Sequence, residues 1–376
     1  MNTLSIVDRV VLHLFLIDGV GYATVTRLLA LCEQKDIPFD RLYTFSMRDM
    51  ELVFGLRQSY AERVVRGLSQ TDLVDVECMR AEKHGIKIIP LTHNQYPTML
   101  KEIASPPLVL YVQGEIDVLH HTILAVIGSR KGDNYGEVIV KESVEQLTAS
   151  RWVIVSGGAN GIDTMAHNYT MKFGGKTIVV LGSGLLNITG AERRKLCRDI
   201  VRSGGALVSI FSMMTEAQPH HFPMRNRVIA GLSRGCVVVQ AAQKSGALIT
   251  AQYALDQGRE LFVFPGRVTC PLSAGCHKLI QEGAKLVTSV YDILVEFEGY
   301  AIQRMTVDSK NSKKQCSYAS TSLEARILKV CEEPMTSDDL ADFFDISMGE
   351  LTTALWNLQN DRLIEQRHTG QWFLIY

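Results

Sequence analysis

The stretch QPHHFPMRNRVIAGLSRGCVVVQAAQKSGALIT, residues 218–250, is the most informative part of the chain. It places Arg225, Asn226 and Arg227 just before an apolar segment, which leads into a buried-type strand at 236–240. A Lys-Ser-Gly turn then opens a second helical pattern. A cation cluster, a strand end and a helix N-terminus are three ways to hold phosphate. Because no general base, nucleophile or metal-ligand set accompanies them, the stretch favours a binding surface for a polyanion over a catalytic pocket.

On both sides of this stretch, from residue 122 to 264, short apolar runs alternate with helical patterns. Each run is rich in Val, Ile or Leu without strict alternation, as strands buried on both faces are. Helical patterns lie between them, for example at 136–149, 163–173 and 247–257. This order predicts an α/β fold with a Rossmann-like, doubly wound, mostly parallel sheet. The expected strands are Ile123–Ile127, Trp152–Val155, Thr177–Leu181, Ala206–Ser209, Cys236–Gln240 and Leu261–Phe264.

The N-terminal segment, residues 1–75, is predicted to form short helices. An apolar helix meets a glycine turn at Gly19 and Gly21 and is followed by a second helix. This pattern is typical of a helix-hairpin-helix, whose turn can present backbone N–H groups to a DNA phosphate. A helical bundle without DNA contact is an equal alternative, because Lys and Arg do not gather densely at the turn.

The remaining segments complete the predicted organisation. Two strand-like runs at 86–90 and 108–112 lead into the central domain, and residues 301–321 are polar and aperiodic, as flexible linkers are. The last 55 residues predict three helices, at 323–331, 337–344 and 348–359, and a hairpin-like end with its turn at Thr369-Gly370. Together these form a winged helix whose third helix carries Glu350 and no Lys or Arg. The predicted domains are 1–75, a helix-hairpin-helix-like domain; 76–300, an extended Rossmann-like DNA-binding domain; 301–321, the linker; and 322–376, the winged helix.

Composition indicates an ordinary soluble globular protein with an uneven charge distribution. Of 376 residues, 46% are apolar and 21% are charged, which allows two or three domains. Residues 120–300 hold 19 Lys and Arg against 14 Asp and Glu, whereas residues 322–376 hold 4 against 10. The central part is therefore expected to attract phosphate, and the C-terminal part to repel it.

The sequence carries no recognised targeting or membrane signal. The N-terminus lacks a signal-peptide apolar region with a cleavage site, and no apolar run reaches the ~18 residues that a membrane span needs. The eight cysteines form no CxxC pair, and the spacing of Cys270, Cys276 and His277 fits no common zinc site. We therefore expect a cytoplasmic protein with reduced thiols, no metal and no cofactor.

Three expected strand ends are rich in glycine: Gly128-Ser129-Arg130, the loop from Ser156 to Asp163, and Gly182-Ser183-Gly184. Ligands of open parallel sheets bind at the carboxyl ends of the strands, where glycines let a phosphate approach the backbone. The spacing matches neither GxGxxG after the first strand nor a Walker GxxxxGK[ST], so dinucleotide and NTP sites are weakly supported.

Single residues at these ends allow more than one role. Arg130 is expected to grip a phosphate, with pairing to a carboxylate as the alternative. Asp163 is expected to cap the following helix, with an acid/base role as the alternative. His167 has no evident partner in the sequence and is interpreted as structural.

Arg225 and Arg227 are two residues apart, and on an extended segment alternate side chains point the same way. Both are therefore expected to reach one phosphate strip. Phe222 offers a stacking face for a single-stranded base, or is a core aromatic. Lys244 and Ser245 begin a helix and repeat the phosphate-site chemistry. The last cation considered is Lys176, just before the third strand, a weaker candidate that also fits plain surface.

These segments together resemble one family. GSR at 128–130, SGGANGIDTMAH at 156–167, GGKTIVVLGSGL at 174–185, FPMRNRVIAGLS at 222–233 and KSGALITAQYALDQGRELFVFPG at 244–266 are similar to the DNA-processing protein A family, also called DprA or Smf. The resemblance runs from about 124 to 287, and the flanking modules resemble those of many members.

The resemblance implies a function without catalysis. Members are not known as enzymes; they bind and protect single-stranded DNA, form homodimers through the Rossmann domain, and help to load a RecA-type recombinase in natural transformation. Carried over motif by motif, it implies a DNA-binding pocket made of Gly128, Ser129, Arg130, Gly157, Gly158, Gly161, Phe222, Arg225, Asn226, Arg227, Lys244 and Ser245.

The chain departs from the family pattern at three places. Residues 185–190 lack the usual Leu-Asp and the Tyr-Pro pair that follows, so this loop is left out of the expected site. Gln240 stands where the family usually has Glu, which is expected to remove a carboxylate from the floor of the site. Asn160 replaces a basic residue.

The alternative is an enzyme that cleaves the ribose–base bond of nucleoside monophosphates, as in the lysine-decarboxylase-like group. Members of that group carry a PGGxGTxxE motif, whereas the comparable place here reads QKSGALITAQ. The motif's glutamate is missing, and Gln240 cannot supply the carboxylate that such a hydrolase needs to stabilise an oxocarbenium-like centre.

Overall fold

The structure of the protein is a computed structural model that describes residues 4–297, 322–331, 335–360, 364–366 and 371–374. The chain divides into two compact units, residues 1–296 and 297–376, and each is described by itself. The predicted linker at 301–321 lies outside the described residues.

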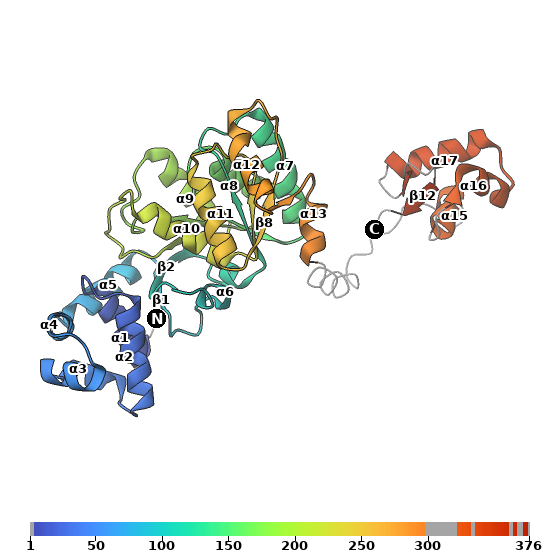
Figure 1. Ribbon diagram of the computed structural model, residues 1–376. Helices are drawn as coiled ribbons and strands as arrows, with labels where there is room; N and C mark the ends of the chain where they lie inside the picture. The colour runs from blue at the N-terminus through green and yellow to red at the C-terminus, as the bar shows by residue number, and fades with distance from the viewer. Residues whose placement is uncertain (1–3, 298–321, 332–334, 361–363, 367–370, 375–376) are drawn as a thin grey trace. The chain divides into compact units, whose positions relative to one another are not determined.

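The first unit is built on a nine-stranded sheet with the order β1-β2-β6-β5-β4-β3-β7-β8-β9. Figure 1 shows this unit, with β1 and β2 on the side of the N-terminal helices. The strands from β6 to β9 in this order run parallel to their neighbours, while β2 pairs antiparallel with both β1 and β6. The predicted mostly parallel α/β sheet is therefore confirmed. The bounds are β1 Ile86–Pro90, β2 Val109–Gly114, β3 Ile123–Ile127, β4 Val153–Ser156, β5 Thr177–Leu181, β6 Ala206–Ser209, β7 Gly235–Val238, β8 Glu260–Val263 and β9 Lys285–Leu286.

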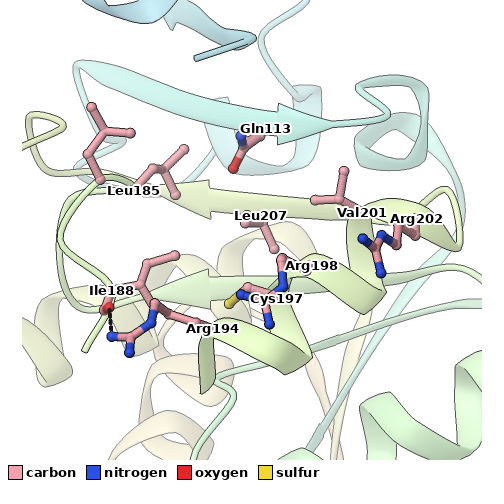
Figure 2. A pocket seen from close by; sticks show the side chains of 10 residues that line it. Gln113, Leu185, Ile188, Arg194, Cys197, Arg198, Val201, Arg202 and Leu207 are labelled. Carbon is pink, nitrogen blue, oxygen red and sulfur yellow. Dashed lines mark hydrogen bonds between the residues drawn. The ribbon is translucent and has the colours of Figure 1, made fainter. Parts of the chain in front are cut away.

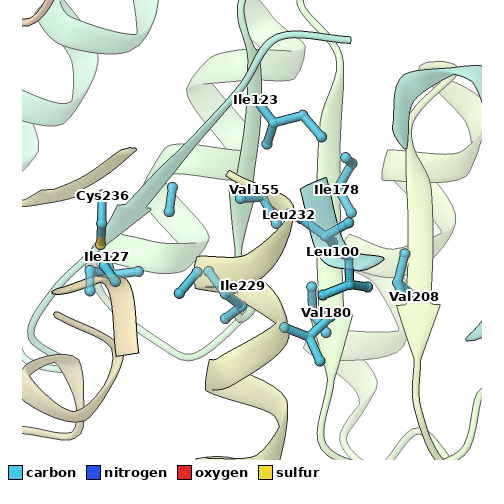
Figure 3. Packing of buried hydrophobic residues seen from close by; sticks show 14 of the residues in the cluster. Leu100, Ile123, Ile127, Val155, Ile178, Val180, Val208, Ile229, Leu232 and Cys236 are labelled. Carbon is cyan, nitrogen blue, oxygen red and sulfur yellow. The ribbon is translucent and has the colours of Figure 1, made fainter. Parts of the chain in front are cut away.

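The central strands are almost wholly apolar because helices cover both faces of the sheet. One face packs against α10, α11 and α12, and Figure 3 shows part of this core around Ile127, Val155 and Val180. The opposite face packs against α7, α8 and α9. The bounds are α6 Thr98–Lys101, α7 Asn134–Ala149, α8 Ile162–Lys172, α9 Ala191–Arg202, α10 His221–Leu232, α11 Gly246–Asp256, α12 Ala274–Gln281 and α13 Tyr291–Leu294.

Five α-helices precede β1 and share a hydrophobic core with one face of the sheet. A Ser5–Asp8 capping box starts the first helix, and Thr92 Oγ1 donates to Asp8 Oδ1 over 2.6 Å. Glu77 Oε1 accepts from the backbone N–H of Met213, which ties the fifth helix to the loop after β6. The bounds are α1 Ile6–Leu16, α2 Tyr22–Gln34, α3 Met47–Phe54, α4 Gln58–Leu68 and α5 Asp72–Lys83. The division predicted at residues 75 and 76 stays a prediction.

In the part of the second unit that the structure describes, there are three helices and a small antiparallel sheet with the order β10-β12-β11. Its helices coincide with those expected from the sequence, and they bury a core around Ile327, Leu340, Leu351 and Trp372. The turn predicted at Thr369-Gly370 lies outside the described residues. The bounds are α15 Leu323–Val330, β10 Met335–Thr336, α16 Ser337–Phe344, α17 Met348–Asn360, β11 Ile364–Gln366 and β12 Gln371–Leu374.

Candidate nucleic-acid interface

The order of the strands places a crevice at one edge of the sheet. The chain runs from β3 outward through β4 and β5 to β6, then returns to lay β7 on the other side of β3. Such a reversal leaves a gap between the connections at the carboxyl ends of the two strands, where open α/β sheets bind ligands. The loops after β3 and β7 are the segments with Arg130 and with Lys244-Ser245.

A pocket of about 420 Å³ lies at this crevice. It brings together six of the twelve predicted site residues, from three segments of the chain. They are Gly128, Arg130, Phe222, Arg225, Asn226 and Ser245.

A second pocket of about 210 Å³ shares Arg130, Phe222 and Arg225 with the first and adds Gly157. It also contains Asn160 and Arg193, the second of which the sequence analysis did not select. We refer to the two pockets together as the strand-end pocket. Ser129, Gly158, Gly161, Arg227 and Lys244 do not line it.

Arg225 forms the buried floor of the strand-end pocket, with only 5% of its surface exposed. Its Nη1 donates to the carbonyl oxygens of Gly157 and Val180, at the ends of β4 and β5, and its Nε donates to Asn226 Oδ1. Burial lowers the pKa of Arg225 to about 10, although the attraction of the Asp163 carboxylate acts in the opposite direction. The guanidinium therefore stays charged at neutral pH.

Two further arginines surround this floor. Arg193 and Arg130 line the smaller of the two pockets together with Arg225, and both act to lower the pKa of Arg225 by charge repulsion. Arg130 is exposed and Arg193 is half-buried. An anion in the pocket would relieve this repulsion, which is the electrostatic condition for a phosphate site.

The expectation that Arg225 and Arg227 point the same way is wrong. Residues 221–232 form the helix α10 rather than an extended segment, so side chains two positions apart lie about 200° apart around its axis. Arg227 lies toward Tyr96, whose pKa its charge acts to lower, and Gln257 donates to its carbonyl oxygen. Only Arg225 of the pair lines the strand-end pocket.

Asp163 does not cap α8 as predicted. The helix starts after Gly161 without a side-chain cap, and Asp163 Oδ2 instead accepts from the N–H of Ala159 in the preceding loop. Burial raises the pKa of Asp163, while Arg225 acts to lower it. The carboxylate is therefore the buried counter-charge of Arg225.

His167 is structural, as interpreted from the sequence. Its Nδ1 lies 2.7 Å from Thr177 Oγ1, and Thr177 Oγ1 in turn donates to the carbonyl oxygen of Ile154. Complete burial lowers the pKa of His167 to about 3, so the ring is neutral wherever the protein is folded at ordinary pH.

The glycines after β4 serve the packing of the loops. A Cβ on Gly161, where φ is +80°, would lie 2.3 Å from the carbonyl oxygen of Ser129, and one on Gly157 would lie 2.5 Å from Arg225 Nη1. Gly158 also has a positive φ, of +63°. These glycines let the loop after β4 pack against the loop after β3 and leave space for Arg225. Their role is therefore to shape the site through packing rather than to contact a ligand.

Gly161→Ala is expected to lower the free energy of unfolding by about 1–3 kcal/mol. The alanine would be forced into a left-handed backbone conformation, and its Cβ would clash with the backbone of Ser129. Thermal or urea unfolding followed by circular dichroism measures this loss. Gly174→Ala is the matched control, since Gly174 also has a positive φ but an added Cβ would meet nothing within 4 Å. Equal losses in both variants would contradict the packing role of Gly161.

Phe222 presents a half-buried ring to both parts of the strand-end pocket. The guanidinium carbon of Arg225 lies 5.8 Å from the ring centroid, within cation–π range. A Cβ on Gly182 would lie 3.1 Å from the ring, so this glycine leaves Phe222 its space. The ring is therefore held in place at the pocket wall with one side available for stacking.

The segment around Ser245 forms the wall on the β7 side. Ser245 Oγ accepts from the N–H of Ala247 and caps α11, and Asn226 Nδ2 donates to the carbonyl oxygen of Gly246. Lys244 is exposed beside this wall and does not line the pocket. Asn226 thus joins α10 to the start of α11.

Gln240 does not form the floor of the site. It is 1% exposed, its Nε2 donates to Asp133 Oδ1, and its Oε1 accepts from the N–H of the same residue. Asp133 also accepts from the N–H of Gly136 and so caps α7. The amide therefore fixes the loop after β3, and the expected loss of a carboxylate from the pocket floor is wrong.

Cys276 and His277, considered as metal ligands, make other contacts. Cys276 is buried with its Sγ toward the carbonyl oxygen of Val239, and His277 Nε2 contacts the carbonyl oxygen of Gly266. Within the described residues, no group of three His, Cys, Asp or Glu is placed to hold a metal ion. Among the helices of the described ranges, none has the length and apolar character that crossing a membrane requires.

Comparison with known proteins places this fold and site in a family. Residues 87–298 match the family of DNA recombination-mediator protein A. The DNA processing protein DprA of Bacillus subtilis is 41% identical over 222 residues, which cover 59% of this chain and 74% of that protein. Protein Smf of Escherichia coli is 43% identical over 213 residues, which cover 57% of each chain.

Solved structures agree with this comparison. The X-ray structure of DNA processing protein A from Streptococcus pneumoniae has a TM-score of 0.66 and 32% identity, covering 77% of this chain and 97% of that one. The Helicobacter pylori protein, whose structure is described by its single-stranded DNA binding mode, shares the fold at a TM-score of 0.50 and 24% identity, covering 59% and 96%. The chain therefore belongs to the DNA recombination-mediator protein A family.

Proposed function

We propose that this protein binds single-stranded DNA in the strand-end pocket and acts in DNA recombination. The observation that carries the proposal is the convergence of Arg130, Arg193 and Arg225 beside the ring of Phe222. Guanidiniums hold phosphates, and an aromatic ring stacks on a base of any sequence. Membership of the family and the DNA binding described for the Helicobacter pylori relative support the same function.

The pocket favours contacts to the backbone of the nucleic acid over reading of its bases. Its cationic groups suit phosphates, and Asn226, an amide that could bind a base edge, is engaged with Arg225 and Gly246. We therefore expect little sequence preference and a strong dependence on salt.

The proposed function does not involve catalysis. Among the described residues that line the strand-end pocket, Asp163 is the one carboxylate, and its charge is directed to Arg225 and to the loop amide of Ala159. A glycosidic hydrolysis needs a carboxylate free to act on the sugar. The nucleoside-monophosphate hydrolase is therefore not favoured.

The wider context of this function is also a proposal. One pocket of this size holds only a few nucleotides, so useful affinity would come from two pockets in a homodimer that share one strand. We propose that the bound strand is delivered to a RecA-type recombinase in the cytoplasm during natural transformation.

The flanking parts of the chain fit accessory roles in this proposal. Helices α1 and α2, joined through Gly19 with a φ of +75°, fit a helix-hairpin-helix. The helices and small sheet that the structure describes in the second unit fit a winged helix. Its third helix, α17, lacks Lys and Arg, so a protein partner suits it better than DNA.

The proposal is tested by fluorescence anisotropy of labelled oligo-dT with the full chain over a range of salt concentrations. We expect the logarithm of the association constant to fall linearly with the logarithm of salt concentration. The slope should be about −2 if the strand-end pocket makes three phosphate contacts. Binding that does not change with salt, or no binding even at low salt, would reject the proposal. In the second case, saturation by a free mononucleotide would identify a small-molecule site instead.

A further inference from the structure

A second cavity of about 400 Å³, which we call the α9 groove, lies away from the strand-end pocket and shares none of its residues. It is bounded by α9, by the loop between β5 and α9, and by Gln113 and Leu207 on the strands β2 and β6 (Figure 2). Gln113 Nε2 donates to the carbonyl oxygen of His84 after α5, which fixes this edge of the groove.

Three arginines form a row along one side of the α9 groove. Arg194, Arg198 and Arg202 follow one another at four-residue intervals on α9, so they lie on the same side of the helix about 6 Å apart along its axis. All three are exposed, and Figure 2 shows their side chains beside the groove. Arg194 donates to the carbonyl oxygen of Ile188. In the described part of the chain, no ion pair joins any of the three to a carboxylate.

Apart from Gln113, the other walls of the groove are apolar. Leu185 and Leu207 are 4% and 2% exposed and form its base, while Leu186, Ile188 and Val201 are half-buried at its sides. Cys197 adds to the base rather than offering a reactive group, because burial raises the pKa of its thiol to about 11. The volume fits one or two bulky apolar side chains.

We infer that the α9 groove binds an acidic peptide segment of another protein, with apolar side chains inserted at its base and carboxylates paired with the arginine row. An extended peptide presents both kinds of group, and each unpaired guanidinium can take one carboxylate in bidentate fashion. Single-stranded DNA fits less well, because none of the described residues that line the groove is an aromatic on which a base could stack. The inference stands independently of the proposed DNA binding.

Binding of a fluorescein-labelled peptide composed of Asp, Leu and Phe to the full-length protein, followed by anisotropy at low salt, tests this inference. The double variant Arg198→Glu/Arg202→Glu is expected to weaken binding by about tenfold or more, because two attractions become repulsions. Val201→Trp is expected to weaken it similarly by filling the groove while leaving the arginines in place. Lys141→Glu reverses an exposed charge on α7 and is expected to change nothing.

Several outcomes would overturn the inference. One is a wild-type protein that does not bind the acidic peptide, or that binds a peptide with Lys in place of Asp equally well. Another is a Val201→Trp variant that is folded by its thermal melt and binds as wild type does. Oligo-dT measured in parallel is expected to bind the double variant within about twofold of wild type. If the double variant loses oligo-dT binding and the wild type does not bind the acidic peptide, the arginine row belongs to a nucleic-acid surface.

Discussion

Replacing Arg225 by methionine is expected to lower the free energy of unfolding by about 3–5 kcal/mol, because it leaves the buried carboxylate of Asp163 without its counter-charge. The same change removes the donor that joins the carbonyl oxygens of Gly157 and Val180 across the ends of β4 and β5. Methionine keeps a comparable length of apolar chain, so the loss reports mainly on charge and hydrogen bonding. Urea unfolding at neutral pH measures it.

A double-mutant cycle separates the electrostatic contribution of Asp163 from the loss of the other Arg225 contacts. Asp163→Asn in the Arg225→Met background is expected to recover part of the lost stability, because it removes the uncompensated charge while keeping an acceptor for Ala159. If Arg225→Met melts like the wild type but no longer binds oligo-dT, the guanidinium serves the ligand and its structural role is refuted. Charge reversal, Arg225→Glu, is not a suitable test of the DNA site. It would place a second buried carboxylate beside Asp163 and disrupt the fold, so DNA binding would be lost whether or not Arg225 contacts DNA.

The sheet could be predicted because each of its central strands is a short apolar run between turn signals. Helix α10 could not be recognised as a helix over its whole length, and the physical reason is its burial. It packs against the sheet, α11 and α6, so the run from Val228 to Leu232 is wholly buried and shows no helical period. Without that period, the sequence favours an extended segment on which Arg225 and Arg227 would point the same way.

The position of the strand-end pocket followed from the glycine-rich strand ends, but the roles of its residues did not. Whether an arginine faces solvent or a carboxylate depends on segments far apart in sequence, here the loop after β4 and the helix α10. Arg193 was missed because its helix, α9, follows a loop that departs from the family pattern. The basic cluster of Arg193, Arg194 and Lys195 at the start of that helix was the available signal.

Arg130→Glu is expected to weaken oligo-dT binding by about tenfold or more without loss of stability, because Arg130 is exposed and, among the described residues, no ion pair holds it. Arg130→Ala is expected to reduce the salt slope by about 0.7 if one phosphate contact is lost. Lys176→Glu is the charge-matched control. Lys176 is exposed at the amino end of β5, opposite the pocket, where it donates to the carbonyl oxygen of Ser203 over 2.9 Å.

The control and a double variant decide whether the effect is local. Equal losses in Arg130→Glu and Lys176→Glu would mean that binding follows net charge and that the pocket is placed wrongly. Arg193→Glu should weaken binding as Arg130→Glu does, since both guanidiniums converge on Arg225. If the two grip the same phosphate, their combined loss will be smaller than the sum of the single losses; if they grip successive phosphates, the losses will add. Additive losses would indicate that the DNA strand crosses the pocket along the line from β3, which precedes Arg130, to α9, which carries Arg193.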